Sequence, residues 1–339
     1  MPRDTTQRPG RPRIVIVATG GTISSRTREA GAGYTPALTG ADLVAAVPDI
    51  EALAAVEVDD FAHILSQAMT PEMMFALARR VDAHLAPPEV DGVVVTHGTV
   101  TMAESAFMAG LLVASDKPVV FTGAMYPASA PDSDGPRNLR GAIRTAVSVE
   151  ARGLGAVVCM GGEVHAARDV EKLHRASLAA FQSPLAGPLG VADQDRVVLS
   201  RRPARRRTFR VDRIEPEVDL IAVAAGSDDR FINASIAAGA KGIVVEGLPG
   251  RGAVPPAFFE GLKVARARGI VVALASRGLA GRVTGTGRTG WGTSGDLAAI
   301  GAVMGGDLSA PKLRILLMVL LALTRDPAAV QEMVRDVAP

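Results

Sequence analysis

The feature that most constrains this chain is residues 13–23 (RIVIVATGGTI), a hydrophobic run that ends in two glycines. Its consecutive β-branched residues predict a strand buried on both faces, as in a parallel sheet. Gly20 and Gly21 then allow a sharp turn and the close approach of a ligand. Because ligands of open α/β sheets bind beyond the carboxyl ends of strands, Thr22 stands where a reaction is expected. Taken alone, the pattern fits either a nucleophilic hydroxyl or a threonine that caps a helix.

Residues 91–102 (DGVVVTHGTVTM) repeat this pattern, since a short β-branched run is followed by a glycine and several hydroxyl residues. Two such strand ends in one sheet can face a single pocket, which would bring Thr22 and Thr99 together. The two motifs, in this order and at this separation, resemble those of the bacterial L-asparaginase family. Members of that family are amidohydrolases that use a threonine nucleophile, so the resemblance favours the nucleophile over the helix cap.

The chain is expected to form two α/β domains, which its length of 339 residues suits. Strand-like and helix-like segments alternate, so we predict a larger N-terminal parallel-sheet domain over residues 13–190 and a smaller C-terminal parallel α/β domain over residues 218–339. Residues 191–217 are predicted to be a linker, whose arginine-rich run suits a solvated connection better than a phosphate site. Residues 1–12 are polar and predicted to be a disordered tail.

Composition excludes several classes of function. The net charge is +2 and aromatic residues make up 4% of the chain, so we expect no nucleic-acid partner. No apolar run is long enough to span a membrane, and no secretion signal is evident, which predicts a cytoplasmic protein; a secreted form whose signal has been removed also fits. The single cysteine, Cys159, is interpreted as a small buried hydrophobic residue. His165 and His174 lack metal-ligand spacing, so no metal site is predicted.

The family resemblance implies four catalytic residues. Thr22 would attack the amide carbonyl, helped by Tyr34, which follows on a polar stretch; a surface aromatic is the alternative for this tyrosine. Thr99 and Lys172 would form a second pair, since residues 164–172 (VHAARDVEK) resemble the lysine segment of the family. A lysine that is buried near a hydroxyl can act as a base because burial lowers its pKa.

The resemblance also implies how a substrate is held. Ser66 and Gln67 match a segment that binds the carboxylate of the substrate, although a simple strand-to-helix turn would explain them as well. The backbone near Ala124 would contribute at the substrate amide. The implied reaction is amide hydrolysis with release of ammonia, and it needs neither a metal nor an organic cofactor.

Three departures from the family pattern concern the substrate ammonium. Val100 stands where the family has an aspartate, and Arg251 stands where a neighbouring subunit would offer an asparagine. Residues 282–295 contain no acidic residue, although the family has a glutamate in this segment. Because an ammonium without a carboxylate partner is costly to desolvate, we expect free asparagine to be a poor substrate.

The most concrete expectation is therefore an asparaginase-like amidohydrolase acting on a side-chain-type amide without a free α-ammonium. The alternative is a catalytically impaired relative or a binding protein, which Val100 would also fit. A nucleotide-binding protein would need a different glycine spacing after the first strand. Related amidotransferase subunits carry an added domain before that strand. Since the second domain of one subunit completes its neighbour's site in the resembled family, a homodimer or homotetramer is expected.

Overall fold

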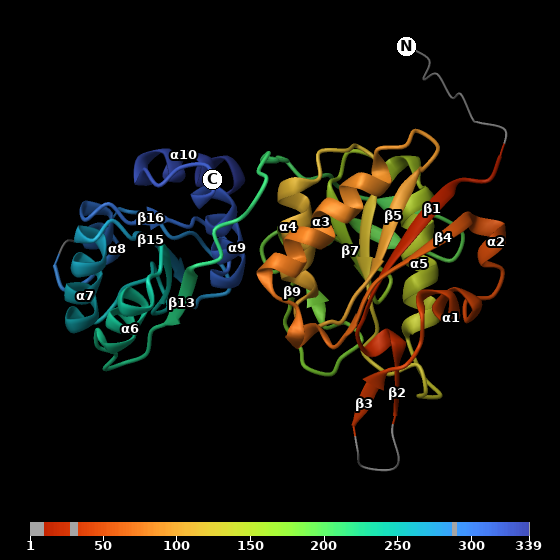
Figure 1. Cartoon of the computed structure of the whole chain (residues 1–339), viewed down its shortest axis with the longest axis horizontal. Coiled ribbons are helices and arrows are strands. Elements are labelled where there is room, and N and C mark those ends of the chain that lie inside the picture. Colours follow the sequence, from red (N-terminus) through yellow and green to blue (C-terminus); the bar gives the residue numbers. More distant parts are fainter. Residues whose placement is uncertain (1–9, 28–32, 287–289, 339) are drawn as a thin grey trace.

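The computed structural model describes residues 10–27, 33–286 and 290–338, which form two α/β domains (Figure 1). The first nine residues of the predicted disordered tail lie outside the described residues. The N-terminal domain is built on a sheet of eight strands. In spatial order these are β12 (Val197–Leu199), β11 (Gly190–Ala192), β8 (Glu163–Ala166), β7 (Ala156–Met160), β6 (Val119–Thr122), β5 (Gly92–Thr96), β1 (Arg13–Gly20) and β4 (Ala55–Ile64).

The predicted first strand, β1, lies inside this sheet. It pairs in parallel with β4 and β5, and its register places Val15 opposite Val93 and Glu57. Ile16 and Val17 are both fully buried although they face opposite sides of the sheet. Strands β4, β1, β5, β6 and β7 are mutually parallel, so their carboxyl ends share one edge. This edge is where the sequence predicts the site.

The predicted parallel-sheet domain is confirmed in the main, and the remainder of its sheet is antiparallel. Gly161 and Gly162, both with positive φ (60° and 85°), turn the chain back from β7 into β8. Strand β11 pairs with β8 and with β12, again antiparallel. Residues 190–199 therefore add strands to the first domain, and the expected linker of residues 191–217 begins with sheet. These are short strands without a clear alternation of side chains, so the sequence gives little signal for them.

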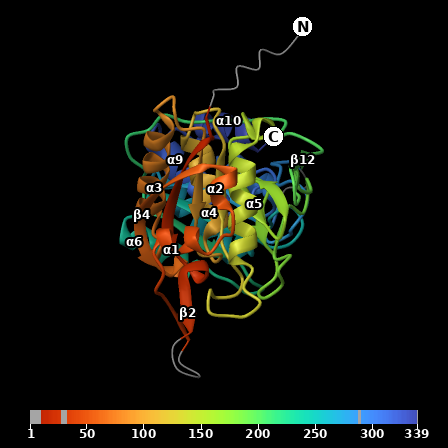
Figure 2. The same cartoon turned by 90° about the vertical axis from the view of Figure 1, so that its right-hand side faces the viewer.

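Helices cover both faces of the large sheet (Figure 2). One face carries α1 (Gly40–Ala45), α2 (Ile50–Leu53) and α5 (Gly135–Val147), and the other carries α3 (Pro71–Leu85) and α4 (Met102–Leu112). Helix α3 starts at a capping residue followed by proline, because the Thr70 side chain accepts the Met73 N–H and Pro71 follows at the first position. The described residues also form three short 3₁₀ helices: η1 (Thr22–Ser24), η2 (Ser66–Ala68) and η3 (Val149–Ala151).

Two small hairpins leave the large sheet. One is formed by β2 (Ser25–Thr27) and β3 (Tyr34–Pro36), and the other by β9 (Glu171–Lys172) and β10 (Phe181–Gln182). Figure 1 shows the β2–β3 hairpin extending away from the body of the domain. The first hairpin carries Tyr34 and the second carries Lys172, two of the predicted catalytic residues.

The C-terminal domain has a parallel four-stranded sheet, as predicted. Its strands, in spatial order, are β13 (Val218–Ala222), β14 (Gly242–Gly247), β15 (Val271–Ser276) and β16 (Val303–Met304). Its helices are α6 (Arg230–Ala238), α7 (Pro256–Ala267), α8 (Ser294–Ala299), α9 (Ala310–Leu321) and α10 (Pro327–Val337). Among the described residues, no helix is both long and apolar enough to cross a bilayer.

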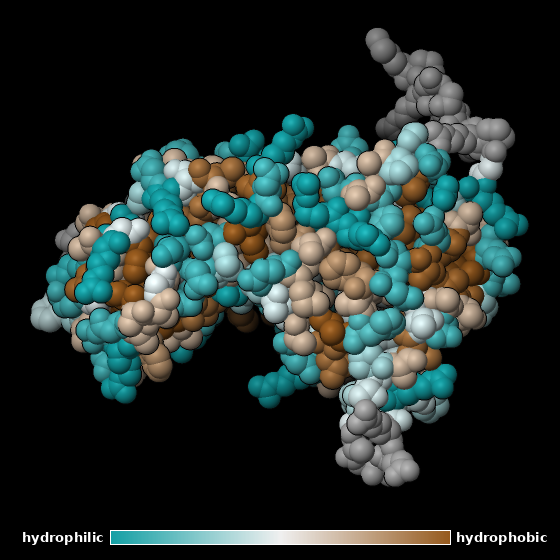
Figure 3. Space-filling model, viewed as in Figure 1, coloured by the Kyte–Doolittle hydropathy of each residue, from teal (hydrophilic) through white to brown (hydrophobic). Residues whose placement is uncertain are grey.

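Helix α9 joins the cores of the two domains. All but two of its twelve residues are buried, because it packs against the C-terminal sheet on one side and against α4 of the N-terminal domain on the other (Figure 1). A helix that is apolar around its whole circumference requires such a doubly covered position. Side chains of both domains thus belong to one hydrophobic cluster. On the outer surface, polar and apolar side chains are interspersed, and the outline is indented between the domains (Figure 3).

The arginine-rich run after β12 binds the backbone of the N-terminal domain. Arg201 donates to the carbonyls of Pro188 and Gly187, and Arg206 donates to those of Val113 and Ser115. These hydrogen bonds fix the connection between the domains. They favour a structural role for the run over phosphate binding.

Candidate functional site

Loops from three neighbouring strands meet at the carboxyl edge of the large sheet. Gly20 and Gly21 have φ of 97° and 83°, and the Gly21 N–H donates to the Ile64 carbonyl at 2.8 Å, which links the ends of β1 and β4. A Cβ on Gly21 would lie 2.4 Å from the Cα of Gly98, which follows β5. Only glycine fits this position, both because of its φ and because of the adjacent backbone. The loops that carry Thr22 and Thr99 are therefore in direct contact.

Thr22 is the first residue of η1 and is half-buried. The N-cap position belongs to Gly21, so the structure gives Thr22 no helix-capping role. The Gly21 carbonyl accepts hydrogen bonds from the hydroxyls of Ser24 and Ser25, at 3.0 and 2.8 Å, which holds the turn that presents Thr22. Helix capping, the structural alternative that the sequence left open, therefore does not explain the presence of Thr22 at this position.

Lys172 and Thr99 form a close pair. The Lys172 Nζ donates to the Thr99 Oγ1 at 2.6 Å, although the two residues are 73 positions apart in the sequence. Thr99 is buried, Lys172 is half-buried, and burial lowers the pKa of Lys172. Strand β9, which carries Lys172, pairs with β10 through Lys172 and Phe181. The arrangement can therefore supply a hydroxyl next to an amine that loses its proton more readily than an exposed lysine.

Ser66 lies against the same loop. Its hydroxyl accepts the Val100 N–H at 3.2 Å, and its carbonyl accepts the Thr101 hydroxyl at 2.8 Å. Gln67 is exposed, and the Val100 side chain is 62% exposed. The three residues expected to contact a substrate here are thus adjacent, and at position 100 the surface offers an exposed valine side chain.

The loop after β6 is held by two residues that the sequence analysis did not assign to the site. Asp134 accepts the backbone N–H groups of Met125 and Tyr126, and Asn138 donates to the carbonyl of Gly123 at 3.0 Å. Ala124 lies between these anchored positions with its side chain fully buried. The signal that could have identified this support is the Asp-Gly-Pro sequence at the start of α5, which places an aspartate beside the strand end.

Tyr34 is carried by a hairpin of the N-terminal domain, and Arg251 is carried by a loop of the C-terminal domain. Tyr34 is half-exposed on the β2–β3 hairpin, opposite Thr27; residues 28–32 of the hairpin lie outside the described residues. Arg251 is exposed on the loop after β14 in the C-terminal domain and donates to the Thr286 carbonyl at 2.9 Å. Within the described part of the chain, neither side chain is hydrogen-bonded to Thr22, Thr99 or Lys172.

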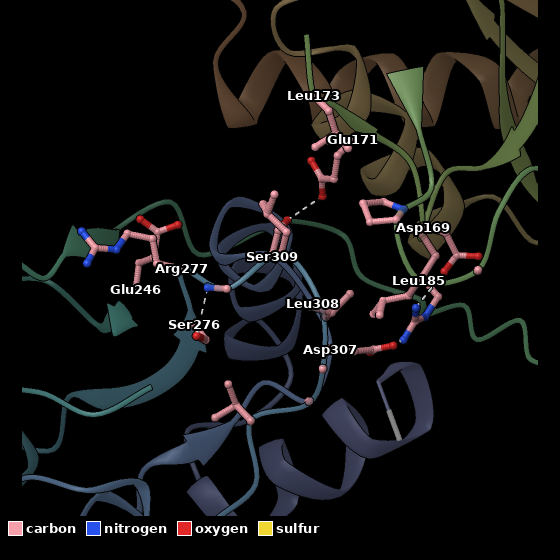
Figure 4. A pocket seen from close by; sticks show the side chains of 18 residues that line it. Asp169, Glu171, Leu173, Leu185, Glu246, Ser276, Arg277, Asp307, Leu308 and Ser309 are labelled. Carbon is pink, nitrogen blue, oxygen red and sulfur yellow. Dashed lines mark hydrogen bonds and ion pairs between the residues drawn. The ribbon is translucent and has the colours of Figure 1, made fainter. Parts of the chain in front are cut away.

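A cavity of about 340 Å³ lies between the two domains (Figure 4). Glu171 and Asp169 from the N-terminal domain line it together with Ser276, Asp307 and Ser309 from the C-terminal domain. Thr22, Thr99 and Lys172 do not line this cavity, although Glu171 is the neighbour of Lys172 in β9. The cavity is therefore adjacent to the lysine segment and separate from the hydroxyl cluster.

The polar groups around the cluster offer no metal site. The described residues contain no group of three or more His, Cys, Asp or Glu side chains placed to hold a metal ion. His97 is fully buried, and burial lowers its pKa to about 4, so it is neutral at pH 7. Its Nδ1 lies 2.8 Å from the Gly98 carbonyl, to which an N–H at this position donates. His97 thus supports the loop between Thr96 and Thr99.

Fold and site together define a two-domain α/β protein with a hydroxyl–lysine pair at the carboxyl edge of its larger sheet. Residues 13–205 match the family described as "Asparaginase, N-terminal", and residues 217–334 match the "Glutaminase/Asparaginase C-terminal domain". The chain belongs to the asparaginase family.

Several members of the family resemble the whole chain. It is 35% identical to L-asparaginase 2 of Escherichia coli K12, over 95% of this chain and 92% of that protein. It is also 35% identical to the "Probable L-asparaginase periplasmic" of Haemophilus influenzae, over 96% of this chain and 93% of the relative. Among solved structures, the "Probable Cytoplasmic L-asparaginase" of Campylobacter jejuni is similar with a TM-score of 0.86 and 33% identity, covering 96% of this chain and 99% of that one.

Proposed function

We propose that this protein is an amidohydrolase that uses Thr22 as its nucleophile and releases ammonia from a linear amide. The observation that carries the proposal is the 2.6 Å hydrogen bond between Lys172 and Thr99, on a loop that touches the turn presenting Thr22. A second hydroxyl paired with an amine supplies what a threonine nucleophile requires, namely a group that can move protons during the two steps of acyl transfer.

In the first step the Thr22 oxygen attacks the amide carbon while its proton leaves through the Tyr34 hydroxyl. The carbon–nitrogen bond breaks, and the nitrogen departs as ammonia after it takes up that proton. In the second step a water, deprotonated by the Thr99–Lys172 pair, attacks the ester carbon, the bond to the Thr22 oxygen breaks, and the proton held by the pair passes to that oxygen, so that the acid product leaves and the Thr22 hydroxyl is restored. For this role the Tyr34 hydroxyl must reach the Thr22 oxygen, and the strand that carries Tyr34, β3, packs against η1, which carries Thr22.

We propose further that the favoured substrate lacks a free α-ammonium. The strand end beside Thr99 presents the exposed Val100 where a carboxylate would be needed to hold such a charge. An ammonium that is desolvated beside a valine loses its hydration without gaining an ion pair, at a cost of several kcal/mol. A dicarboxylic monoamide or an N-acylated asparagine would avoid this cost, and Ser66 and Gln67 are proposed to bind its carboxylate.

The test of the nucleophile is Thr22→Ala. We expect ammonia release from the best substrate to fall by about a thousandfold or more, because no other group replaces the attacking oxygen. The measurement is an ammonia-release screen over asparagine, glutamine, their D-forms, N-acylated analogues and simple monoamides. Thr22→Ser is the matched control, since it keeps the hydroxyl and should retain measurable activity. Activity of Thr22→Ala within about tenfold of the parent would overturn the assignment.

The alternative is a binding protein or an impaired enzyme. It predicts that no amide in the screen releases ammonia, while an amide still raises the melting temperature of the protein. Retention of the Lys172–Thr99 contact favours the enzyme, because a protein that only binds has no need of a partly buried amine at a hydroxyl. A cytoplasmic location is also proposed, from the likeness to the Campylobacter jejuni protein so named, and cell fractionation tests it.

A further inference from the structure

Lys312, at the start of α9, is a buried charge that the proposed chemistry does not use. Its side chain is 2% exposed, although it belongs to the C-terminal domain and the hydroxyl cluster belongs to the N-terminal domain. A buried ammonium is stable only when its hydrogens are all bound, so its partners indicate what it holds in place.

Three acceptors surround the Lys312 ammonium, and all lie in the segment that leads to Lys172. The Nζ donates to the carbonyl of Arg168 at 3.0 Å and to the carbonyl of Val170, and it lies 3.1 Å from the Oε1 of Glu171. The Phe107 ring of α4 lies below the ammonium, with its centroid 5.9 Å from the Nζ. Each of the three N–H groups of the ammonium therefore has one acceptor, so its hydrogen-bonding capacity is fully used.

Glu171 is tied to α9 a second time. Its Oε1 accepts a hydrogen bond from the Ser309 hydroxyl at 2.7 Å. Figure 4 shows this hydrogen bond between two residues that line the interdomain cavity. Arg168 adds further links, to the carboxylate of Asp307 and to the Val337 carbonyl at 2.8 Å. The backbone before Lys172 is thus held on several sides by the C-terminal domain of the same chain.

We propose that Lys312 is a positioning residue for Lys172, acting through Glu171 and the carbonyls of residues 168 and 170. Strand β9 is only two residues long, so its pairing with β10 does little to fix the direction of the Lys172 side chain. The anchors on the preceding residues supply the missing rigidity and keep Lys172 partly desolvated against Thr99. The inference rests on the proposed function, in which Lys172 must lose its proton.

The charges around the Lys312 ammonium set the sign of the expected pH effect. Glu171, Asp169 and Arg168 approach from the segment before Lys172, and Glu104 approaches from α4, with Arg314 on α9 beside it. Replacing Lys312 by methionine takes one positive charge out of this group and removes the donor that holds the backbone before Lys172, so we expect Lys172 to become more exposed to water. Both changes favour the protonated form of Lys172, so its pKa rises and the activity that needs neutral Lys172 appears at higher pH.

The experiment compares kcat, KM and the pH profile of Lys312→Met with those of the parent. We expect kcat to fall about tenfold or more with KM within about twofold, because the substrate contacts are untouched. The acidic limb of the kcat profile should move up by about half a pH unit or more. Ser309→Ala, which changes no charge, should give a smaller effect in the same direction and keeps the proposal testable if Lys312→Met fails to fold.

The matched control is Leu313→Ala, which removes packing next to Lys312 in the same buried helix. It should lower the melting temperature while leaving the acidic limb in place. The proposal is overturned if folded Lys312→Met and Ser309→Ala keep the parent limb and kcat, or if Leu313→Ala moves the limb equally. Lys172→Met separates the two proposals, since activity retained in that variant would contradict the proposed function itself.

Discussion

We expect position 100 to decide whether a substrate ammonium is tolerated, and the surroundings of Val100 make this expectation testable. The side chain is exposed and its backbone N–H is bound to Ser66, so a polar replacement should not disturb the fold. It directly follows Thr99, whose Oγ1 accepts a hydrogen bond from the Lys172 Nζ. We expect a carboxylate here to lie close to both a bound substrate and the lysine.

We predict that Val100→Asp raises activity on free asparagine relative to an N-acylated analogue. A charge-assisted hydrogen bond contributes about 1.5–3 kcal/mol, so the ratio of kcat/KM values should shift about ten- to a hundredfold. Val100→Asn controls for size without charge and should shift the ratio little. An unchanged ratio, together with efficient hydrolysis of asparagine by the parent, would show that other groups hold the ammonium.

The sequence identifies residues well where they share a motif and poorly where they act across the fold. Val100 stands out because it adjoins Thr99 in one short motif. Lys312 does not, because nothing in an apolar helix indicates that its single early lysine reaches a segment of the other domain. Tyr34 is intermediate: its position after the first strand can be read, but its distance from Thr22 depends on a hairpin that no local pattern specifies.

At the scale of elements, the loops after β1 and β5 are in close backbone contact at the site. Gly21→Ala would place a Cβ against the backbone of Gly98 and strain a residue with φ of 83°. We predict a loss of more than about 2 kcal/mol in the free energy of unfolding and loss of most activity, because the loops carrying Thr22 and Thr99 must separate. Urea unfolding and ammonia release measure the two effects.

A second glycine isolates the effect of contact from that of backbone conformation. Gly239 follows α6 with φ of 87°, and a Cβ there would meet nothing within 4 Å. Gly239→Ala should therefore cost only about 1 kcal/mol and leave activity intact. Equal losses in the two variants would mean that the approach of the loops contributes nothing to the site.

Helices and strands could be predicted from the sequence when they were long enough to show a repeating pattern of apolar residues or a recognisable start. Strands β1 and β5, and helices α3, α4, α7 and α10, follow from buried β-branched runs, from capping residues and from proline at helix starts. Strands β9, β11 and β12 have two or three residues each, which is too short for a pattern to appear. The position of Lys172 could accordingly be matched only through the family resemblance.

At the scale of the whole molecule, we predict an assembly of at least two subunits. The expectation comes from the family, in which the second domain of one subunit completes the neighbour's site, and Arg251 on the exposed loop after β14 would be such a contribution. Sedimentation at micromolar concentration should give a mass of at least twice the 35.0 kDa chain. A monomer with full activity under these conditions would contradict the prediction.

The shared burial of α9 also bears on the order in which the molecule can be completed during synthesis. The chain leaves the ribosome from its N-terminus, so α4 emerges long before residues 310–321 exist to cover it. Until they arrive, the nascent N-terminal domain exposes an apolar surface, and the carbonyls before Lys172 lack the ammonium that binds them. The last tenth of the chain thus finishes the first domain, and a truncated product would be prone to aggregation instead of forming an independent smaller enzyme.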